Sequence, residues 1–253
     1  MDFFDFSIFT SWYGIMYLLL LSLLEIVLGI DNIIFVSIVS DRLPKDKRQN
    51  ARNIGLTLAL IVRLILLSIV ALLMEFTEPL FSVWGVDMSV QGLVLLAGGL
   101  FLIFKSTTEM HTTVKADEEE EHLGKATLSG VITQIVLVDI VFSFDSVISA
   151  IGMTKDIQEE TGSNPMIIIY LAVIIAMVIM LLFAKAIGEF ISNHPTIKML
   201  ALSFLVVIGV ILVAEAFGEH IPKGYIYFAL VYSLIVEVMN IRMRKNREEK
   251  KRV

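Results

Sequence analysis

Seven apolar runs dominate this chain, near residues 15–40, 54–74, 90–106, 128–152, 166–187, 197–216 and 225–241. A membrane-spanning helix needs about 20 apolar residues, and in lipid only helices and closed barrels satisfy their backbone hydrogen bonds. Of the 253 residues, 57% are hydrophobic, which exceeds the roughly 45–50% of soluble domains. We therefore predict an all-α polytopic protein with seven transmembrane helices in the lipid bilayer, the third of which looks short.

Lysine and arginine gather in two segments outside the runs. They are concentrated in residues 41–52 and 242–252, whereas residues 1–14 and 75–90 contain none. Because cytoplasmic loops are rich in Lys and Arg, we predict an N-terminus outside and a C-terminus in the cytoplasm, which an odd number of spans permits. No basic region or cleavage site precedes the first run, so we expect an uncleaved signal and a plasma (inner) membrane location.

One acidic motif occurs twice, 114 residues apart. It is an acid, a second acid six residues later, and then a small oxygen-bearing side chain: Glu25, Asp31 and Asn32 in the first run, and Asp139, Asp145 and Ser146 in the fourth. Three helices separate the starts of the two copies, so the copies run in opposite directions. We predict a 3+3 inverted repeat with one C-terminal helix, the arrangement in which transporters place a site near the midplane.

The repeat divides the chain into four predicted segments. Residues 1–107 form the first three-helix repeat, 108–127 an acidic cytoplasmic linker, 128–217 the second, inverted repeat, and 218–253 the seventh helix with a basic cytoplasmic tail. The acidic run at 117–122 within the linker is interpreted as a solvated connector, and a role in sensing metal stays open.

Acids inside a membrane span must be sheltered, since one Asp facing lipid at the bilayer centre costs roughly 2.5–3.5 kcal/mol. Residues seven apart share a helix face, whereas residues six apart are about 120° apart. Glu25 should therefore share a face with Asn32, while Asp31 points toward another neighbour. A break of the first helix at Gly29 would relax this geometry and would free backbone carbonyls as ligands.

The predicted metal-binding residues are Asp31, Asn32, Asp145 and Ser146, with Glu25 and Asp139 as further ligands or proton carriers. Carboxylate, amide and hydroxyl oxygens suit Mg²⁺, Ca²⁺ and Mn²⁺. The chain has no cysteine, and its four histidines lie in predicted loops. A hard divalent cation is therefore favoured, and ligand chemistry does not choose among these three. A structural hydrogen-bonded pair of acids is the alternative.

Four other polar residues are candidates for gating or ion pairing: Arg63, Glu215, Glu237 and Asn240. Arg63 is the single basic residue deep in a run, and we expect it to pair with one of the acids as a tethered surrogate cation or as a structural ion pair. Glu215 is a candidate for an outer vestibule, and Glu237 with Asn240 for an inner one. Ordinary helix-end roles stay open for these three.

The chain resembles the TerC family of integral membrane proteins in four stretches. They are Asp31-Asn32 and the segments 139–152, 194–204 and 221–227. The resemblance implies a seven-helix fold related to the LysE-type exporters. It also implies export of Mn²⁺ from the cytosol, which supports metalation of extracytoplasmic enzymes. The family is named for tellurite resistance, but that phenotype implies no tellurium chemistry in this chain.

We predict a secondary-active exporter of a divalent cation, with Mn²⁺ as the leading candidate and protons as the coupling ion. No cofactor, nucleic acid or enzymatic activity is expected, and an oligomer stays open. The alternatives are a transporter of Ca²⁺ or another small solute, and a membrane scaffold or assembly factor whose buried acids hold helices together. An intramembrane enzyme lacks a supporting sequence signature.

Overall fold

The computed structural model describes residues 8–9, 11–69, 79–83, 86–115, 126–161, 166–219 and 221–252. These residues form seven helices and one antiparallel hairpin. The helices are α1 (Trp12–Ser40), α2 (Lys45–Ser68), α4 (Val90–Val114), α6 (Leu128–Thr161), α7 (Met166–Ser192), α8 (Pro195–Ala216) and α9 (Lys223–Arg252), and the strands are β1 (Pro79–Val83) and β2 (Val86–Ser89). The predicted seven helices are confirmed, whereas the hairpin was not predicted.

Six of the described helices are long and apolar enough to cross a membrane, and α6 adds the apolar stretch Leu128–Phe144. The third predicted helix is not short, because α4 has 25 residues and continues to Val114. Its last turns enter the predicted linker, so that His111 lies in a helix and not in a loop. The acidic run at 117–122 lies outside the described residues.

Local signals set several of the helix ends. Ser11 precedes α1 and its Oγ accepts a hydrogen bond from the backbone N–H of Gly14, and Ser89 caps α4 in the same way. Such side-chain oxygens satisfy backbone donors that the first helical turn leaves unpaired. At the other end of the bundle α8 begins with Pro195, whose missing N–H costs nothing in a first turn.

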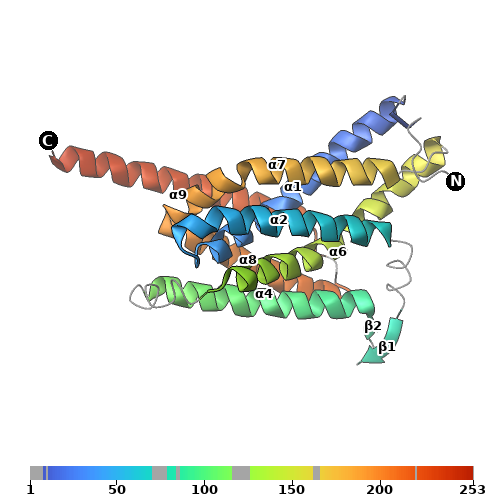
Figure 1. Cartoon of the computed structure of the whole chain (residues 1–253), viewed down its shortest axis with the longest axis horizontal. Coiled ribbons are helices and arrows are strands. Elements are labelled where there is room, and N and C mark those ends of the chain that lie inside the picture. The colour runs from blue at the N-terminus through green and yellow to red at the C-terminus, as the bar shows by residue number, and fades with distance from the viewer. Residues whose placement is uncertain are drawn as a thin grey trace.

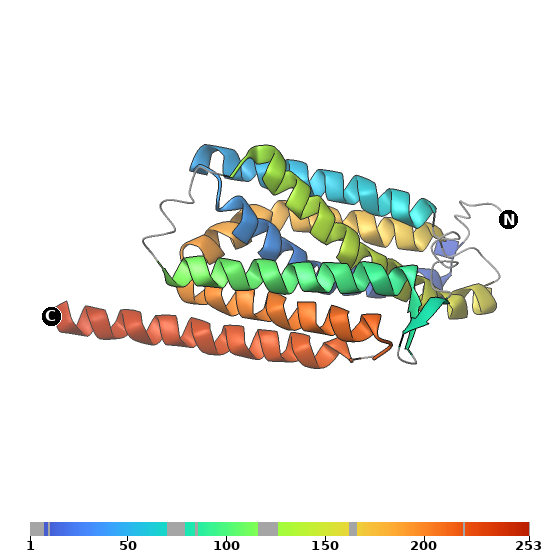
Figure 2. The ribbon, with the colours of Figure 1, turned by 90° about the horizontal axis from the view of Figure 1, so that it is seen from below.

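Helix α1 is the central element of the bundle (Figures 1 and 2). It packs mainly against α7, while α2 packs against α6 and α4 against α8. Every residue from Asp31 to Asp41 is buried, whereas Trp12, Leu19 and Leu23 in the first half of α1 are exposed. One half of α1 is therefore enclosed by protein on all sides, and a polar group there must find its partners among other helices.

Glycines allow the close crossing of α4 and α8. A Cβ atom added at Gly99 would lie 2.6 Å from the carbonyl oxygen of Gly209, and one added at Gly209 would lie 2.9 Å from that of Gly99. A Cβ at Gly98 would meet the Val141 side chain of α6 at 2.3 Å. Small residues of this kind let membrane helices approach closely.

Helix α9 is the least enclosed span. It lies beside α8 at the edge of the bundle and extends past it (Figure 2). Only 6% of its apolar window is buried, compared with 50% for α1. Most of its apolar surface therefore faces outward, where lipid would cover it.

Candidate functional site

A buried ion-pair cluster joins three helices in the middle of the bundle. Arg63 of α2 donates from Nη1 to Oε2 of Glu25 in α1 at 2.8 Å, and from Nη2 to Oδ1 of Asp139 in α6 at 3.0 Å. The exposed fractions of these three residues are 2–3%. We predicted that Arg63 would pair with one acid, and it pairs with two.

Asp139 is surrounded by donors. Its Oδ1 also accepts from Nδ2 of Asn32 at 3.0 Å, and its Oδ2 accepts from the Ser143 hydroxyl at 3.0 Å. Ser143 in turn accepts from Nε of Arg63 at 2.9 Å. Both oxygens of this carboxylate are thus engaged, which is what a charge buried away from water requires.

The helical periodicity explains how these side chains meet. Glu25 and Asn32 are seven residues apart and both reach the same cluster, which confirms the predicted shared face. Ser143 is one turn after Asp139, and residues four apart are neighbours on a helix surface. Sequence reasoning missed Ser143 as an acceptor for the guanidinium, although its spacing from Asp139 was a usable signal.

The other predicted ligands lie close to this cluster along α1 and α6. Asp31 is 3% exposed and Ser146 4% exposed, and the Ser146 hydroxyl donates to the Ser143 carbonyl at 3.4 Å. The Oδ1 atom of Asn32 is buried and makes no hydrogen bond among the described residues. Asp145 belongs to α6, and its side chain lies outside the described part of the chain.

The prediction of a helix break at Gly29 is wrong. Helix α1 runs from Trp12 to Ser40 without interruption, and Gly29 serves packing instead. A Cβ atom at this position would lie 2.3 Å from Sδ of Met180 in α7. The glycine therefore gives α7 room to approach α1, and it does not free backbone carbonyls.

The residues predicted for the two vestibules lie on α8 and α9. Asn240 donates to Oε2 of Glu237 at 3.4 Å, as the spacing of three residues predicted. Glu215 is half-buried near the end of α8. None of the described contacts joins these three residues to the central cluster, so their gating roles remain predictions.

Groups of three or more His, Cys, Asp or Glu side chains arranged to hold a metal do not occur among the described residues. Glu25 and Asp139 come together only with Arg63 between them. The oxygens that could serve a hard cation are those of Asp31, the Asn32 carbonyl and the Ser146 hydroxyl, all from α1 and α6. Their chemistry suits Mn²⁺, Mg²⁺ or Ca²⁺.

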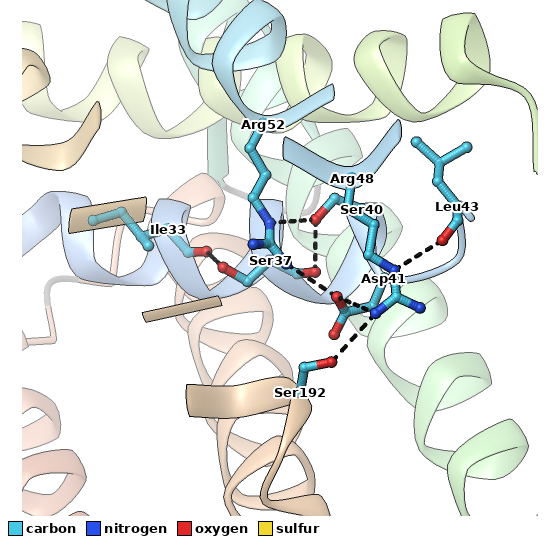
Figure 3. A network of polar contacts seen from close by, with 8 residues as sticks. All are labelled: Ile33, Ser37, Ser40, Asp41, Leu43, Arg48, Arg52 and Ser192. Carbon is cyan, nitrogen blue, oxygen red and sulfur yellow. Dashed lines mark hydrogen bonds and ion pairs between the residues drawn. The ribbon is translucent and has the colours of Figure 1, made fainter. Parts of the chain in front are cut away.

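A second polar network closes the end of the bundle where α1 turns into α2 (Figure 3). Arg52 donates to Oδ1 of Asp41 at 3.0 Å and to the Ser40 hydroxyl at 2.8 Å. Arg48 lies 3.3 Å from the same Asp41 oxygen and reaches Ser192 of α7 at 3.4 Å. Burial raises the pKa of Asp41 above its usual 3.8, against the opposing charges of Arg48 and Arg52.

Two further contacts fasten this end. Arg42 forms an ion pair with Glu109 of α4, in which Nε donates to Oε2 at 2.7 Å. The guanidinium of Arg52 rests on Gly188 of α7, where an added Cβ would lie 2.4 Å from Cζ. From the sequence these arginines were assigned to topology alone, and the partner of Arg42 could not be predicted because Glu109 lies 67 residues away from it.

Comparisons with known proteins place these features in a family. The sequence model described as "Integral membrane protein TerC family" matches residues 10–252. A UPF0053 protein of Haemophilus influenzae is 49% identical over 230 residues, which cover 90% of this chain and 93% of that protein. The UPF0053 inner membrane protein YgdQ of Escherichia coli is 46% identical over 227 residues, covering 89% and 92%.

A longer relative contains a similar unit. The UPF0053 inner membrane protein YoaE of Escherichia coli is 47% identical over 237 residues, which are 93% of this chain but only 43% of that protein. No solved structure matches the chain. The relation to the LysE-type exporters therefore stays a prediction.

Proposed function

The chain belongs to the TerC family of integral membrane proteins, and on that premise we propose that it is a secondary-active exporter of a divalent metal cation, with Mn²⁺ as the cargo. The observation that carries this proposal is the set of buried acids that α1 and α6 bring to the middle of the bundle. Intramembrane ionisable groups commonly mark ion pathways. Oxygen-only donors favour a hard cation over zinc or copper.

In this proposal the cation binds between α1 and α6. Asp31, Asp145 and the carbonyl oxygen of Asn32 are its main ligands, and Ser146 is a further one. Uptake of protons by acids of this region after the cation leaves would couple export to proton entry. No enzymatic step and no resident cofactor is part of the mechanism.

The helix pairing supports an inverted repeat. Helix α1 packs on α7 and α2 packs on α6. A twofold relation between the first three helices and the next three would superpose α1 on α6 and α2 on α7. It would therefore exchange these two pairs. Gly99 of α4 and Gly209 of α8 also face each other reciprocally. A site between α1 and α6 would then lie at the interface between repeats, as in other transporters built this way.

The proposed orientation has the α1–α2 turn and the end of α9 in the cytoplasm. Helix α1 begins at one end of the bundle and α9 finishes at the opposite end (Figure 1). The Lys- and Arg-rich segments, residues 41–52 and 242–252, agree with the positive-inside rule. The names of the Escherichia coli relatives support an inner membrane location.

Transport of ⁵⁴Mn²⁺ into liposomes containing the purified full chain tests the function. We expect uptake that depends on a pH gradient and is reduced at least about tenfold by Asp31→Asn, equivalent to about 1.4 kcal/mol of lost binding. Competition by Ca²⁺ and Mg²⁺ then ranks the cations. Glu189→Gln is the matched control, since Glu189 is 61% exposed in α7.

A membrane scaffold is the second candidate, and the fully bonded Asp139 favours it, because such a network also serves to hold helices together. Absence of ⁵⁴Mn²⁺ uptake by the folded wild-type protein would refute the exporter. If Asp31→Asn moved Mn²⁺ as fast as Glu189→Gln, the assignment of Asp31 as a ligand of the cargo would be refuted.

A further inference from the structure

We propose that Arg63 is a built-in counter-cation, which takes the place of a second bound cation at Glu25 and Asp139 and, through Asp139, aims the Asn32 carbonyl oxygen at the transported ion. This inference rests on the cation transport proposed above and deepens it. It makes Arg63 a positioning residue and removes Glu25 and Asp139 from the set of cargo ligands.

Hydrogen bonds engage every nitrogen of the Arg63 guanidinium. Its three guanidinium nitrogens donate to three different side chains, Glu25, Asp139 and Ser143, at 2.8–3.0 Å. These acceptors come from two helices other than its own. Arg63 is 2% exposed, so a metal that displaced it would leave a buried guanidinium without its partners, which is strongly unfavourable.

The carboxylate of Asp139 accepts three hydrogen bonds from protein donors. Its Oδ1 accepts from Arg63 and from Asn32, and its Oδ2 accepts from Ser143. A carboxylate that already serves three donors presents little free lone-pair density to a metal ion. Asp139 thus acts as an acceptor for protein donors, while the cargo is left to other oxygens.

The hydrogen bond to Asp139 fixes the orientation of the Asn32 side chain. An ionised carboxylate only accepts hydrogen bonds, so the amide nitrogen of Asn32 must face Asp139. This leaves Oδ1 of Asn32 turned the other way, buried and without a hydrogen bond among the described residues. Buried polar atoms normally have a partner, and a hard divalent cation is one that suits a carbonyl oxygen.

The two copies of the motif are not equivalent in this respect. Ser143, which Arg63 contacts, occupies the repeat position of Gly29, and the side chain that lies against Gly29 is the thioether of Met180. Arg63 bonds an acid of each copy, but at this position the second copy contacts the guanidinium and the first contacts an apolar group. Glu25, Asp139 and Arg63 together carry a formal charge of −1 in place of −2, so Arg63 already supplies one positive charge.

Charge-compensated variants test the proposal. Glu25→Gln alone changes the formal charge of this trio from −1 to 0, and Arg63→Met alone changes it to −2. The double variant E25Q/R63M restores −1 and keeps the bonds of Asp139 to Asn32 and Ser143. Four proteins, the wild type, both single variants and the double variant, are compared for the KM and Vmax of ⁵⁴Mn²⁺ transport in liposomes.

We expect each single change to raise KM about tenfold or more, and the double variant to return to within about threefold of the wild type. Arg63→Lys, which keeps the charge but lacks the planar fork, should retain more transport than Arg63→Met. If Glu25 were a cargo ligand, the double variant would stay as impaired as Glu25→Gln, and that result would overturn the proposal.

Thermal stability in detergent separates this inference from the proposed function. If the folded wild type moves no Mn²⁺, the exporter fails, and the counter-cation role is then judged by whether the double variant is more stable than Arg63→Met. A folded double variant beside an unfolded Arg63→Met also supports charge compensation. A double variant no more stable than Arg63→Met contradicts it.

Discussion

Replacing Arg63 by methionine should destabilise the folded protein, and the loss should grow as pH rises. Methionine approximates the length of the arginine stem without its charge, so the change mainly removes the partner of Glu25 and Asp139. Both carboxylates are then 2–3% exposed without their counter-charge. They must either remain ionised in the protein interior or take up protons from solvent.

The size of the effect follows from these two routes. Removing one partner of a buried ion pair costs about 3–5 kcal/mol. Protonating a carboxyl with an ordinary pKa near 4 costs about 1.4 kcal/mol per pH unit above that value. For two such groups this is about 8 kcal/mol at pH 7 and about 3 kcal/mol at pH 5. We therefore expect a loss of about 3–8 kcal/mol at pH 7 that shrinks toward pH 5.

The sign of the pH dependence follows from proton counting. In Arg63→Met the folded chain would hold up to two protons that the unfolded chain has released at neutral pH, so its stability falls as pH rises.

Equilibrium unfolding in mixed detergent micelles at pH 5 and pH 7 measures the effect. Glu189→Gln is the control, because its partner Lys185 lies 4.0 Å away on the surface and an exposed pair contributes less than about 1 kcal/mol. A loss for Arg63→Met that is no larger than this control, or one that is the same at both pH values, would refute the reasoning.

Three other predictions concern the frame of the site. Gly99→Ala places a Cβ 2.6 Å from the Gly209 carbonyl oxygen and should lower the free energy of unfolding by about 1–3 kcal/mol through overpacking. Gly224→Ala, whose added Cβ has no atom within 4 Å, should lower it by none. Unfolding in detergent compares the two variants. Glu109→Gln should lower the free energy of unfolding by about 1–3 kcal/mol, because it removes the charged acceptor of Arg42. A double-mutant cycle with Arg42→Gln should return a coupling energy of that size. Absence of coupling would show that this ion pair does not stabilise the packing of α4 at this end. Burial raises the pKa of Asp41 above 3.8, so the stability contributed by its protonated form is present below pH 3.8 and is lost as pH rises through the folded-state pKa. Unfolding measured at several pH values should therefore show the wild type losing stability relative to Asp41→Asn over that interval. Parallel curves for the two proteins would contradict this.

The helices themselves follow closely from local sequence. Helices α6, α7 and α8 each begin or end within a few residues of the predicted runs. A run of about 20 apolar residues can satisfy its backbone hydrogen bonds in lipid only as a helix. The extension of α4 past residue 106 could not be predicted in this way. Its last turns are polar, and hydropathy detects the lipid-facing part of a helix and not its continuation into water.

The candidate site divides in the same manner. The shared face of Glu25 and Asn32 was predictable from the seven-residue spacing, since helical periodicity is a local property. The seating of Arg63 on both Glu25 and Asp139 was not, because these residues are 38 and 76 positions away from it. The role of Gly29 was misjudged for the same reason, as the approach of Met180 is a tertiary contact.

The sequence by itself determined that this is a polytopic membrane protein with a duplicated acidic motif and oxygen-only donors, because apolar length, charge and ligand type are properties of single segments. Only the tertiary structure decided how the acids are partnered. A buried charge is stable only with an opposite charge beside it, and the seating of Arg63 between Glu25 and Asp139 depends on how α1, α2 and α6 pack. That packing distinguishes an acid held by Arg63 from an oxygen available to a cation.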